Sequence, residues 1–393
     1  MKINSLVMKI ADSCNMNCPH CGYYFTRRRP SFRQLMSTEC LSTVFRRTEE
    51  YLRNSSDIPK RFMFSWHGGE PLLAGLDFFH TIIELQHAFF GNSFLICNCV
   101  QTNGTLINDE WAKFFKDHDF EVGISVDGMR DLHDKYRPFR NGKGTYDRVA
   151  RNVGLLREIE VPLRALCVIH PEANGREVFD HIVSLGFQFI DFLPLIANWE
   201  TKDWYPSFNV DIGSFLIDAF DAWYELDDPQ IRVRWFADLI VMILGHPAPG
   251  LCTLKDHCSG HLTIDYDGAI NNCECLNICG QSIFNFNSNV WSSSFAEVEK
   301  IESFLLLTEG FKHIGKTCLE CEAYSLCKGG CPSTRYKNNS FKRPSIYCKS
   351  FRRLAFLIRN KVMSDPIFQC NNSHEELSEK IPMQKENREK NKS

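Results

Sequence analysis

The chain has 393 residues, enough for two or three domains, and its 45 basic and 48 acidic residues leave a formal net charge of −3. The basic residues do not form one long block, so nothing indicates nucleic-acid binding. No apolar run approaches the roughly 20 residues of a membrane span, and the N-terminus lacks the apolar region of a signal peptide. We therefore expect a cytoplasmic protein with no membrane and no nucleic-acid partner.

Strand-like and helix-like segments alternate from about residue 3 to residue 195. The predicted strands are 6–11, 62–66, 94–101, 120–126, 163–169 and 187–193. The amphipathic segments between them are 39–52, 76–90, 109–117, 146–159 and 176–185. Six such units predict an α/β fold with a parallel sheet and outer helices, and six are too few for a closed eight-stranded barrel.

The rest of the chain predicts three further parts after the sheet of residues 1–195. Residues 196–250 contain helix-like segments at 212–225 and 231–244, which we interpret as a helical bridge. Residues 251–360 hold ten of the eighteen cysteines and have too little periodicity for a large core, so we expect metal clusters to organise them. The polar tail 371–393 is predicted to be disordered.

Eighteen cysteines in a cytoplasmic chain are not explained by disulfides, because that compartment is reducing, and metal clusters are the economical explanation. Three of them, Cys14, Cys18 and Cys21, follow the first predicted strand with C-x3-C-x2-C spacing. Structural zinc sites and cubane iron–sulfur clusters normally take four protein ligands. Three thiolates therefore leave one iron open to a small molecule. A partial zinc knuckle or three unrelated thiols are the alternatives.

A second motif, Gly-Gly-Glu-Pro at residues 68–71, follows the second predicted strand. Glycines let the backbone come close, and a carboxylate accepts hydrogen bonds from an ammonium group. Together with the cysteine loop, this motif resembles the radical S-adenosylmethionine (SAM) family. The resemblance implies a partial (β/α)6 radical SAM barrel in which the open iron of a [4Fe–4S] cluster chelates SAM. One electron from the cluster would cleave SAM and release a 5′-deoxyadenosyl radical.

The same resemblance implies that residues at the carboxyl ends of the strands contact the cofactor. These residues would be Gly68, Gly69 and Glu70 at the SAM amino group, Tyr23 near the adenine, and Ser125. Tyr23 could equally be an aromatic packed over the cysteine loop, and Ser125 a hydroxyl that caps a turn. Residues 127–128 indicate a turn first and a site second.

The C-terminal cysteines follow another pattern. Their spacings are C-x15-G-x4-C from Cys252 to Cys273 and C-x2-C-x5-C-x3-C from Cys318 to Cys331, followed by Cys348. This pattern resembles the SPASM domain. Nearly the whole chain therefore resembles radical SAM/SPASM enzymes, the branch that modifies peptides and proteins.

By this resemblance two auxiliary [4Fe–4S] clusters form. The ligands of the first would be Cys252, Cys273, Cys331 and Cys258, the last being an additional ligand of anaerobic sulfatase-maturing enzymes. The ligands of the second would be Cys318, Cys321, Cys327 and Cys348. Full ligation by protein argues for electron transfer, and two zinc sites of the C-x2-C type are the alternative. Cys275 and Cys279 could be spare thiols, ligands in an alternative register or packing residues. We expect the remaining cysteines to be core or surface residues, namely Cys40, Cys97, Cys99, Cys167 and Cys370.

Two residues depart from the sulfatase-maturing pattern. Glu274 follows Cys273, where those enzymes place an Asp proposed to deprotonate the substrate after hydrogen abstraction. We expect Glu274 to be the catalytic base, and a solvated loop carboxylate is the alternative. His67 stands where those enzymes usually carry Gln, and it could touch the substrate or only orient the loop.

These features predict a radical SAM oxidoreductase that modifies a residue of a peptide or protein substrate by oxidation or cross-linking. The auxiliary clusters would accept the second electron, with flavodoxin or ferredoxin as the electron donor of the enzyme. The departures at Glu274 and His67 favour a maturase of ribosomal peptides. The alternatives are a formylglycine-generating sulfatase maturase, a non-catalytic iron–sulfur redox or scaffold protein, and a radical SAM enzyme that acts on a small molecule.

Overall fold

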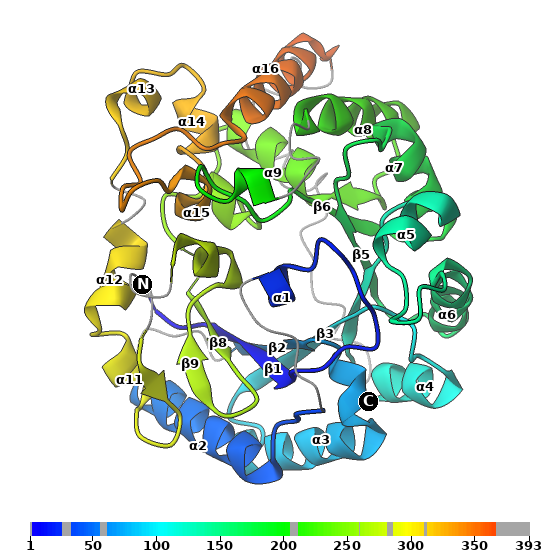
Figure 1. Ribbon diagram of the computed structural model, residues 1–393, viewed down its shortest axis with the longest axis vertical. Helices are drawn as coiled ribbons and strands as arrows, with labels where there is room; N and C mark the ends of the chain where they lie inside the picture. Colours follow the sequence, from blue (N-terminus) through cyan, green and yellow to red (C-terminus); the bar gives the residue numbers. More distant parts are fainter. Residues whose placement is uncertain are drawn as a thin grey trace, which may run out of the picture.

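The computed structural model describes residues 2–25, 33–55, 61–204, 211–258, 260–280, 286–309 and 313–366. Within these residues lies a ten-stranded sheet with the strand order β10-β9-β8-β1-β2-β3-β4-β5-β6-β7. Figure 1 shows the sheet in the middle of the molecule and helices around its outside. Cys370 and the tail 371–393, for which disorder was predicted, lie outside the described residues.

The six central strands and their helices confirm the predicted parallel sheet with outer helices. The parallel strands are β1 (Ser5–Ala11), β2 (Arg61–Gly68), β3 (Leu95–Thr102), β4 (Glu121–Ser125), β5 (Leu163–Val168) and β6 (Phe189–Leu193). The helices that follow them are α2 (Thr38–Asn54), α3 (Leu76–Phe90), α4 (Asp109–Asp117), α5 (Arg130–Tyr136), α6 (Tyr146–Glu158) and α7 (Gly175–Ser184). Of these elements, only α5 lacks a predicted counterpart.

Polar residues fix where several of these helices begin. Ser37, Asn108 and Asn174 stand directly before α2, α4 and α7. The side chain of each accepts a hydrogen bond from a backbone N–H group in the first helical turn, which would otherwise have no partner within the helix. The helices are therefore anchored at the ends that receive the chain from the sheet.

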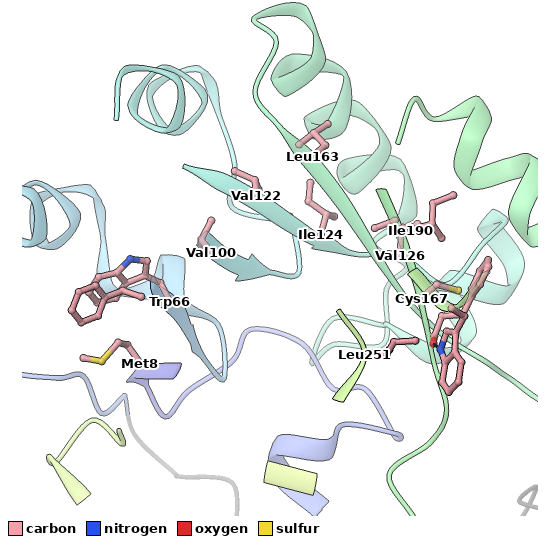
Figure 2. Packing of buried hydrophobic residues seen from close by; sticks show 14 of the residues in the cluster. Met8, Trp66, Val100, Val122, Ile124, Val126, Leu163, Cys167, Ile190 and Leu251 are labelled. Carbon is pink, nitrogen blue, oxygen red and sulfur yellow. Dashed lines mark hydrogen bonds between the residues drawn. The ribbon is translucent and has the colours of Figure 1, made fainter. Parts of the chain in front are cut away.

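The outer face of the sheet is apolar and lies under the helices. On β2 the buried side chains of Phe64 and Trp66 alternate with more exposed ones, as expected for a strand with one face covered. The ring of Phe45 on α2 lies 5.1 Å from the ring of Phe64. Figure 2 shows how this packing continues across the neighbouring strands, for example at Val100 and Ile124. The opposite, inner face of the sheet is left for polar side chains.

The C-terminal part of the chain joins the same sheet along the edge of β1. β8 (His261–Ile264) pairs in parallel with β1, β9 (Ala269–Asn271) returns antiparallel to β8, and β10 (Ser288–Asn289) pairs with β9. Gly268, in the turn between β8 and β9, has a φ of 85°, which glycine adopts without strain. No strand was predicted here, because segments of two to four residues carry no periodic pattern.

At the other edge of the sheet, β7 (Arg232–Val233) pairs with β6. α8 (Ile212–Leu226) packs on α7, and α16 (Cys348–Ser364) packs on both α8 and α9 (Arg234–Ile243). The helix predicted for 231–244 begins later because the backbone at residue 232 bonds to β6 instead, and α16 was not predicted.

The division into parts 1–195, 196–250 and 251–360 stays a prediction, and the sheet crosses both of its boundaries.

Shorter helices complete the described chain. They are α1 (Gly22–Phe25), η1 (Pro71–Ala74), η2 (Lys202–Trp204), η3 (Cys252–Leu254), η4 (Glu274–Cys279), α11 (Phe295–Val298), α12 (Glu302–Glu309), α13 (Lys316–Leu319), α14 (Tyr324–Cys327) and α15 (Pro332–Arg335). Among the described residues, no helix combines the length and the apolar character that crossing a membrane requires.

A buried ion cluster ties the cysteine loop to the ends of β4 and β5. Asp127, fully buried just after β4, accepts a hydrogen bond from Arg137 Nη2 over 2.9 Å, and its carboxylate lies 2.8 Å from His170 Nε2. His20, inside the cysteine loop, lies 3.6 Å from the same carboxylate. Burial alone would raise the pKa of Asp127, but Arg137 and His170 hold it well below its usual range. Asp127 therefore does more than form the predicted turn.

We expect Asp127→Asn to lower the free energy of unfolding by about 3–5 kcal/mol, because it leaves the buried Arg137 guanidinium without its counter-charge. The matched control is Asp147→Asn, since Asp147 pairs with Arg130 at the surface, where ion pairs contribute about 0–1 kcal/mol. Anaerobic urea unfolding of both variants measures the difference. Equal losses in the two variants would contradict the role given to Asp127.

Candidate active site

The cysteine loop, residues 12–21, is held against the ends of β1 and β2 by backbone hydrogen bonds. Gly69 N donates to Ala11 O over 2.7 Å, and Glu70 N donates to Ser13 O over 2.8 Å. These two bonds join the Gly-Gly-Glu motif directly to the start of the loop. The two motifs that the sequence analysis combined are therefore neighbours in space.

The three cysteines of the loop lie close enough for their thiols to interact. Burial, the Glu70 carboxylate and the thiols of Cys18 and Cys21 together raise the pKa of Cys14 to about 12. Buried thiols that resist ionisation become stable thiolates when a cationic centre balances their charge. This donor set therefore fits an iron–sulfur cluster with one open iron, and it does not supply the fourth ligand of a closed zinc site.

Gly68 and Gly69 are required where β2 passes the cysteine loop. A Cβ atom on Gly68 would lie 2.2 Å from Ala11 O, and a Cβ atom on Gly69 would lie 2.3 Å from Ser13 O. Gly68 also has a φ of 133°, which side chains other than glycine rarely tolerate. The glycines thus let the motif approach the loop backbone, and their contact with the SAM amino group stays a prediction.

The Glu70 carboxylate is buried among hydrogen-bond donors. Its Oε1 accepts from Thr102 Oγ1 over 2.6 Å and from Leu72 N over 3.1 Å, and its Oε2 accepts from Asn103 N over 2.8 Å. Burial raises the pKa of Glu70 to about 7, although these bonds act in the opposite direction. A carboxylate has about four acceptor positions, so these three bonds leave one for a further donor. A contact with the SAM amino group is compatible with this arrangement and stays a prediction.

Tyr23 and Ser125, the other predicted SAM contacts, have partners within the protein. Tyr23 is buried, its hydroxyl donates to Asp12 Oδ1, and Lys9 Nζ lies 4.9 Å from the centre of its ring. Ser125, at the end of β4, accepts a hydrogen bond from Gln101 Nε2 over 3.1 Å. Tyr23 lies on α1, directly after the cysteine loop, and Ser125 is the last residue of β4, and their contacts with SAM stay predictions.

A buried lysine connects the first strand to the predicted catalytic base. The register of β1 and β2 pairs Lys9 with His67, so both side chains lie on the inner face of the sheet. Lys9 is 1% exposed, and its Nζ lies 2.9 Å from Glu274 Oε1 and 4.0 Å from Asp265 Oδ1. Burial lowers the pKa of His67, while Glu274 acts in the opposite direction. Both departures from the sulfatase-maturing pattern, His67 and Glu274, therefore adjoin Lys9.

Glu274 remains accessible, since 23% of its side chain is exposed. It opens η4, which contacts α1, the helix that follows the cysteine loop (Figure 1). The sequence analysis placed Glu274 at the site but did not include Lys9. The available signal was a single charged residue inside the apolar strand 6–11, which does not say where its partner lies.

Cys258 lies near the other three predicted ligands of the first auxiliary cluster, Cys252, Cys273 and Cys331. Burial raises the pKa of Cys258, and those three thiols raise it further. His261, the first residue of β8, is hydrogen-bonded to Cys273, and this bond raises the pKa of His261 against the effect of burial. The structure thus brings these four cysteines together, and Cys273 is hydrogen-bonded to a histidine of the sheet. Their role as ligands stays a prediction.

The four predicted ligands of the second auxiliary cluster are also gathered. Burial raises the pKa of Cys348, and it is raised further by the thiols of Cys327, Cys318 and Cys321. Arg335 is fully buried, and burial lowers its pKa, while Cys331 of the first group and Cys318 of the second act in the opposite direction. A guanidinium therefore lies near thiols of both groups, where thiolates would need compensating charge.

Cys275 and Cys279, which had no assigned role, adjoin the first group. A hydrogen bond from the Cys275 thiol lowers the pKa of Cys273 and raises that of Cys275. Cys279 is buried, and its Sγ lies 3.9 Å from Ser333 O. Both cysteines therefore lie beside thiols of the first group.

Comparison with known proteins agrees with this arrangement. The model of the radical SAM superfamily matches residues 8–185. The cysteine-type anaerobic sulfatase-maturating enzyme of Clostridium novyi is 30% identical over 365 residues, which cover 90% of this chain and 94% of that enzyme. The serine-type enzyme of Bacteroides thetaiotaomicron is 27% identical over 88% of this chain and 87% of that enzyme. The solved structure "Native anSMEcpe with bound AdoMet and Cp18Cys peptide" is 25% identical, with a TM-score of 0.80 over 92% of this chain and 100% of that chain.

These similarities extend over the parallel sheet and the C-terminal cysteines alike. They confirm the partial radical SAM barrel followed by a cysteine-rich region, and the family uses SAM with a [4Fe–4S] cluster. The chain is a radical SAM enzyme and belongs to the family of the anaerobic sulfatase-maturating enzymes.

Proposed function

We propose that this enzyme removes a hydrogen atom from a side chain of a peptide or protein and then oxidises the resulting radical. The observation that carries the proposal is the accessible Glu274 carboxylate, held by Lys9 on the inner face of the sheet and adjoining the first auxiliary cysteine group. A peptide substrate is supported by the related solved structure, which contains the Cp18Cys peptide. Bound SAM and its cluster would supply the radical that takes the hydrogen atom.

Glu274 would act after hydrogen abstraction. The abstraction itself needs no base, but an oxidised product requires the loss of a proton and a second electron. Glu274 would take the proton, and the 2.9 Å contact between Lys9 Nζ and Glu274 Oε1 would fix the direction of its carboxylate. Because Cys273 directly precedes Glu274, the proton and the electron would leave the substrate on the same side.

The cysteine groups would hold the iron–sulfur clusters. Cys14, Cys18 and Cys21 would bind the SAM cluster, and the motif at residues 68–70, with Tyr23 and Ser125, would bind SAM itself. The ligands of the first auxiliary cluster would be Cys252, Cys258, Cys273 and Cys331. The ligands of the second auxiliary cluster would be Cys318, Cys321, Cys327 and Cys348. The buried Arg335 would offset the negative charge of both.

Two substrate classes fit this site. The resemblance to sulfatase-maturing enzymes implies Gln and Asp where this chain has His67 and Glu274, which favours a ribosomal peptide that is oxidised or cross-linked. The near-full-length similarity to a cysteine-type and a serine-type sulfatase-maturating enzyme favours oxidation of Cys or Ser to formylglycine as the second candidate. Mass spectrometry after incubation with matched sulfatase-type peptides, one with Cys and one with Ser, separates them. An aldehyde product on either peptide would establish the second candidate.

We expect anaerobically reconstituted protein to bind about twelve irons per chain, because eleven ligand cysteines would hold three cubanes. The triple variant Cys14→Ala, Cys18→Ala, Cys21→Ala should retain about eight. Cys40→Ala is the matched control and should keep the full content, because Cys40 lies on α2 and is not among the eleven predicted ligands. Iron and zinc analysis of the purified chains measures this. About four irons in the wild type, or zinc in their place, would refute the two auxiliary clusters.

Replacing the proposed base should separate SAM cleavage from product formation. We expect Glu274→Gln to cleave SAM and to lose roughly 10²-fold or more of its product, since the amide cannot accept the proton. Glu274→Asp keeps the carboxylate and should lose less. Glu225→Gln, which removes an exposed carboxylate paired with Arg176, is the control and should retain full activity. Mass spectrometry of the peptide and quantification of deoxyadenosine measure both steps, and unchanged product in Glu274→Gln would place the base elsewhere.

A further inference from the structure

One segment of the C-terminal part is strongly basic in a chain whose net charge is −3. Residues 337–361 contain eight of the chain's basic residues and no acidic residue. They comprise the segment before α16 and most of α16 itself, the helix at the upper edge of Figure 1. A local excess of this kind attracts acidic partners over a distance of about 10 Å at moderate ionic strength.

Residues between 343 and 356 of this segment, together with Trp199, line a pocket of about 580 Å³. Its lining includes four cations, Arg343, Lys349, Arg352 and Arg353, and it also includes Cys348. We call it the basic pocket. Because Cys348 is the first residue of α16, the pocket lies at the N-terminal end of a seventeen-residue helix, where the backbone dipole adds positive potential.

The cations of the basic pocket are only weakly engaged by the rest of the protein. Arg352 lies 3.7 Å from Glu322 Oε1, in a pair whose side chains are 48% and 65% exposed. Arg353 pairs with Asp211 in another exposed contact. Arg343 is exposed and lies 6.0 Å from the ring of Trp199. Exposed pairs contribute about 0–1 kcal/mol, so a partner with its own carboxylates can replace them.

We propose that the basic pocket is the docking surface for a small acidic one-electron carrier protein. This proposal rests on the proposed function, because it takes Cys348 to be a ligand of the second auxiliary cluster. A carrier seated here would contact a cluster ligand directly, and electron transfer weakens steeply with distance. Encounters between redox proteins use small interfaces that are steered by charge, which fits a pocket rimmed by four cations. A nucleic acid would need a basic track longer than this pocket to follow its backbone, although Trp199 and Phe356 also line the pocket.

With a carrier docked at this pocket, the electrons of SAM cleavage and substrate oxidation balance. One electron and one substrate hydrogen atom convert SAM into methionine and 5′-deoxyadenosine. The substrate radical would then lose one proton to Glu274 and one electron to the oxidised carrier, and the clusters that the two C-terminal cysteine groups would hold would supply the route for that electron. The carrier is thereby reduced by one electron, which equals the electron spent on SAM. The net reaction is oxidation of the substrate by two electrons at the expense of one SAM.

The test measures binding of a recombinant flavodoxin to reconstituted enzyme by fluorescence anisotropy at low and high ionic strength. We expect Arg343→Glu with Arg352→Glu to raise the Kd at least about tenfold at low ionic strength and to remove most of its salt dependence. The milder pair Arg343→Gln with Arg352→Gln should fall between this variant and the wild type. The control pair, Lys143→Glu with Arg151→Glu, reverses exposed charges before and on α6, away from α16, and should bind as the wild type does.

Two further measurements keep the proposal separate from the proposed function. Iron content and dithionite-driven SAM cleavage need no carrier, so both should be unchanged in the charge-reversal pair. A Kd within error of the wild type in that pair, or tighter binding of a mixed-sequence single-stranded RNA than of flavodoxin, would overturn the docking surface. Loss of dithionite-driven product with intact flavodoxin binding would instead count against the proposed function.

Discussion

A buried cation on the first strand sets the central constraint of this structure. Lys9 is almost fully enclosed, and a buried charge without a partner costs on the order of several kcal/mol. Its two carboxylate neighbours, Asp265 and Glu274, both come from the C-terminal part of the chain. The buried positive charge of Lys9 on β1 is therefore compensated only when the cysteine-rich segment lies beside this strand. The two halves of the enzyme form one unit through this requirement.

The strand that carries Lys9 also positions the residues proposed to take part in the reaction. β8 extends the sheet beside β1 and presents His261 to Cys273, and the chain returns through β9 to place Glu274 over Lys9. On the other side of β1, β2 delivers the Gly-Gly-Glu motif to the backbone of the cysteine loop. A single strand, β1, thus aligns the residues proposed to bind SAM, to take the substrate proton and to hold the first auxiliary cluster. This explains how groups more than 250 residues apart meet without a separate docking step.

Elements with a repeating sequence pattern were predicted correctly. Elements and side chains whose position depends on a residue far away in the chain were mostly missed. The six central strands and five of their helices follow from alternating and helical periodicities. The two C-terminal cysteine groups follow from the resemblance to the SPASM domain, and the structure places the thiols of each group near one another. The β8–β10 strands are too short to show a period and exist because β1 offers an edge. α16 was missed although Phe351, Leu354, Ala355, Ile358 and Val362 form a helical stripe. The roles of Lys9 and Asp127 were not predicted, because a single charged residue in a sequence does not show which residue it pairs with. The partner of Lys9, Glu274, lies 265 residues away along the chain.

The pairing of β8 with β1 also has a consequence for synthesis of the protein. β1 is synthesised long before β8, and it borders β2 on one side and β8 on the other, while β8 ends only at Ile264. A nascent chain can therefore assemble β1 to β6 while one side of β1 still presents unsatisfied backbone groups. Such an open margin is a template for pairing with another chain. Fragments that stop before residue 261 should consequently be prone to aggregate. In the full chain, rapid pairing of β8 with β1 would cover the exposed edge and protect the barrel from aggregation.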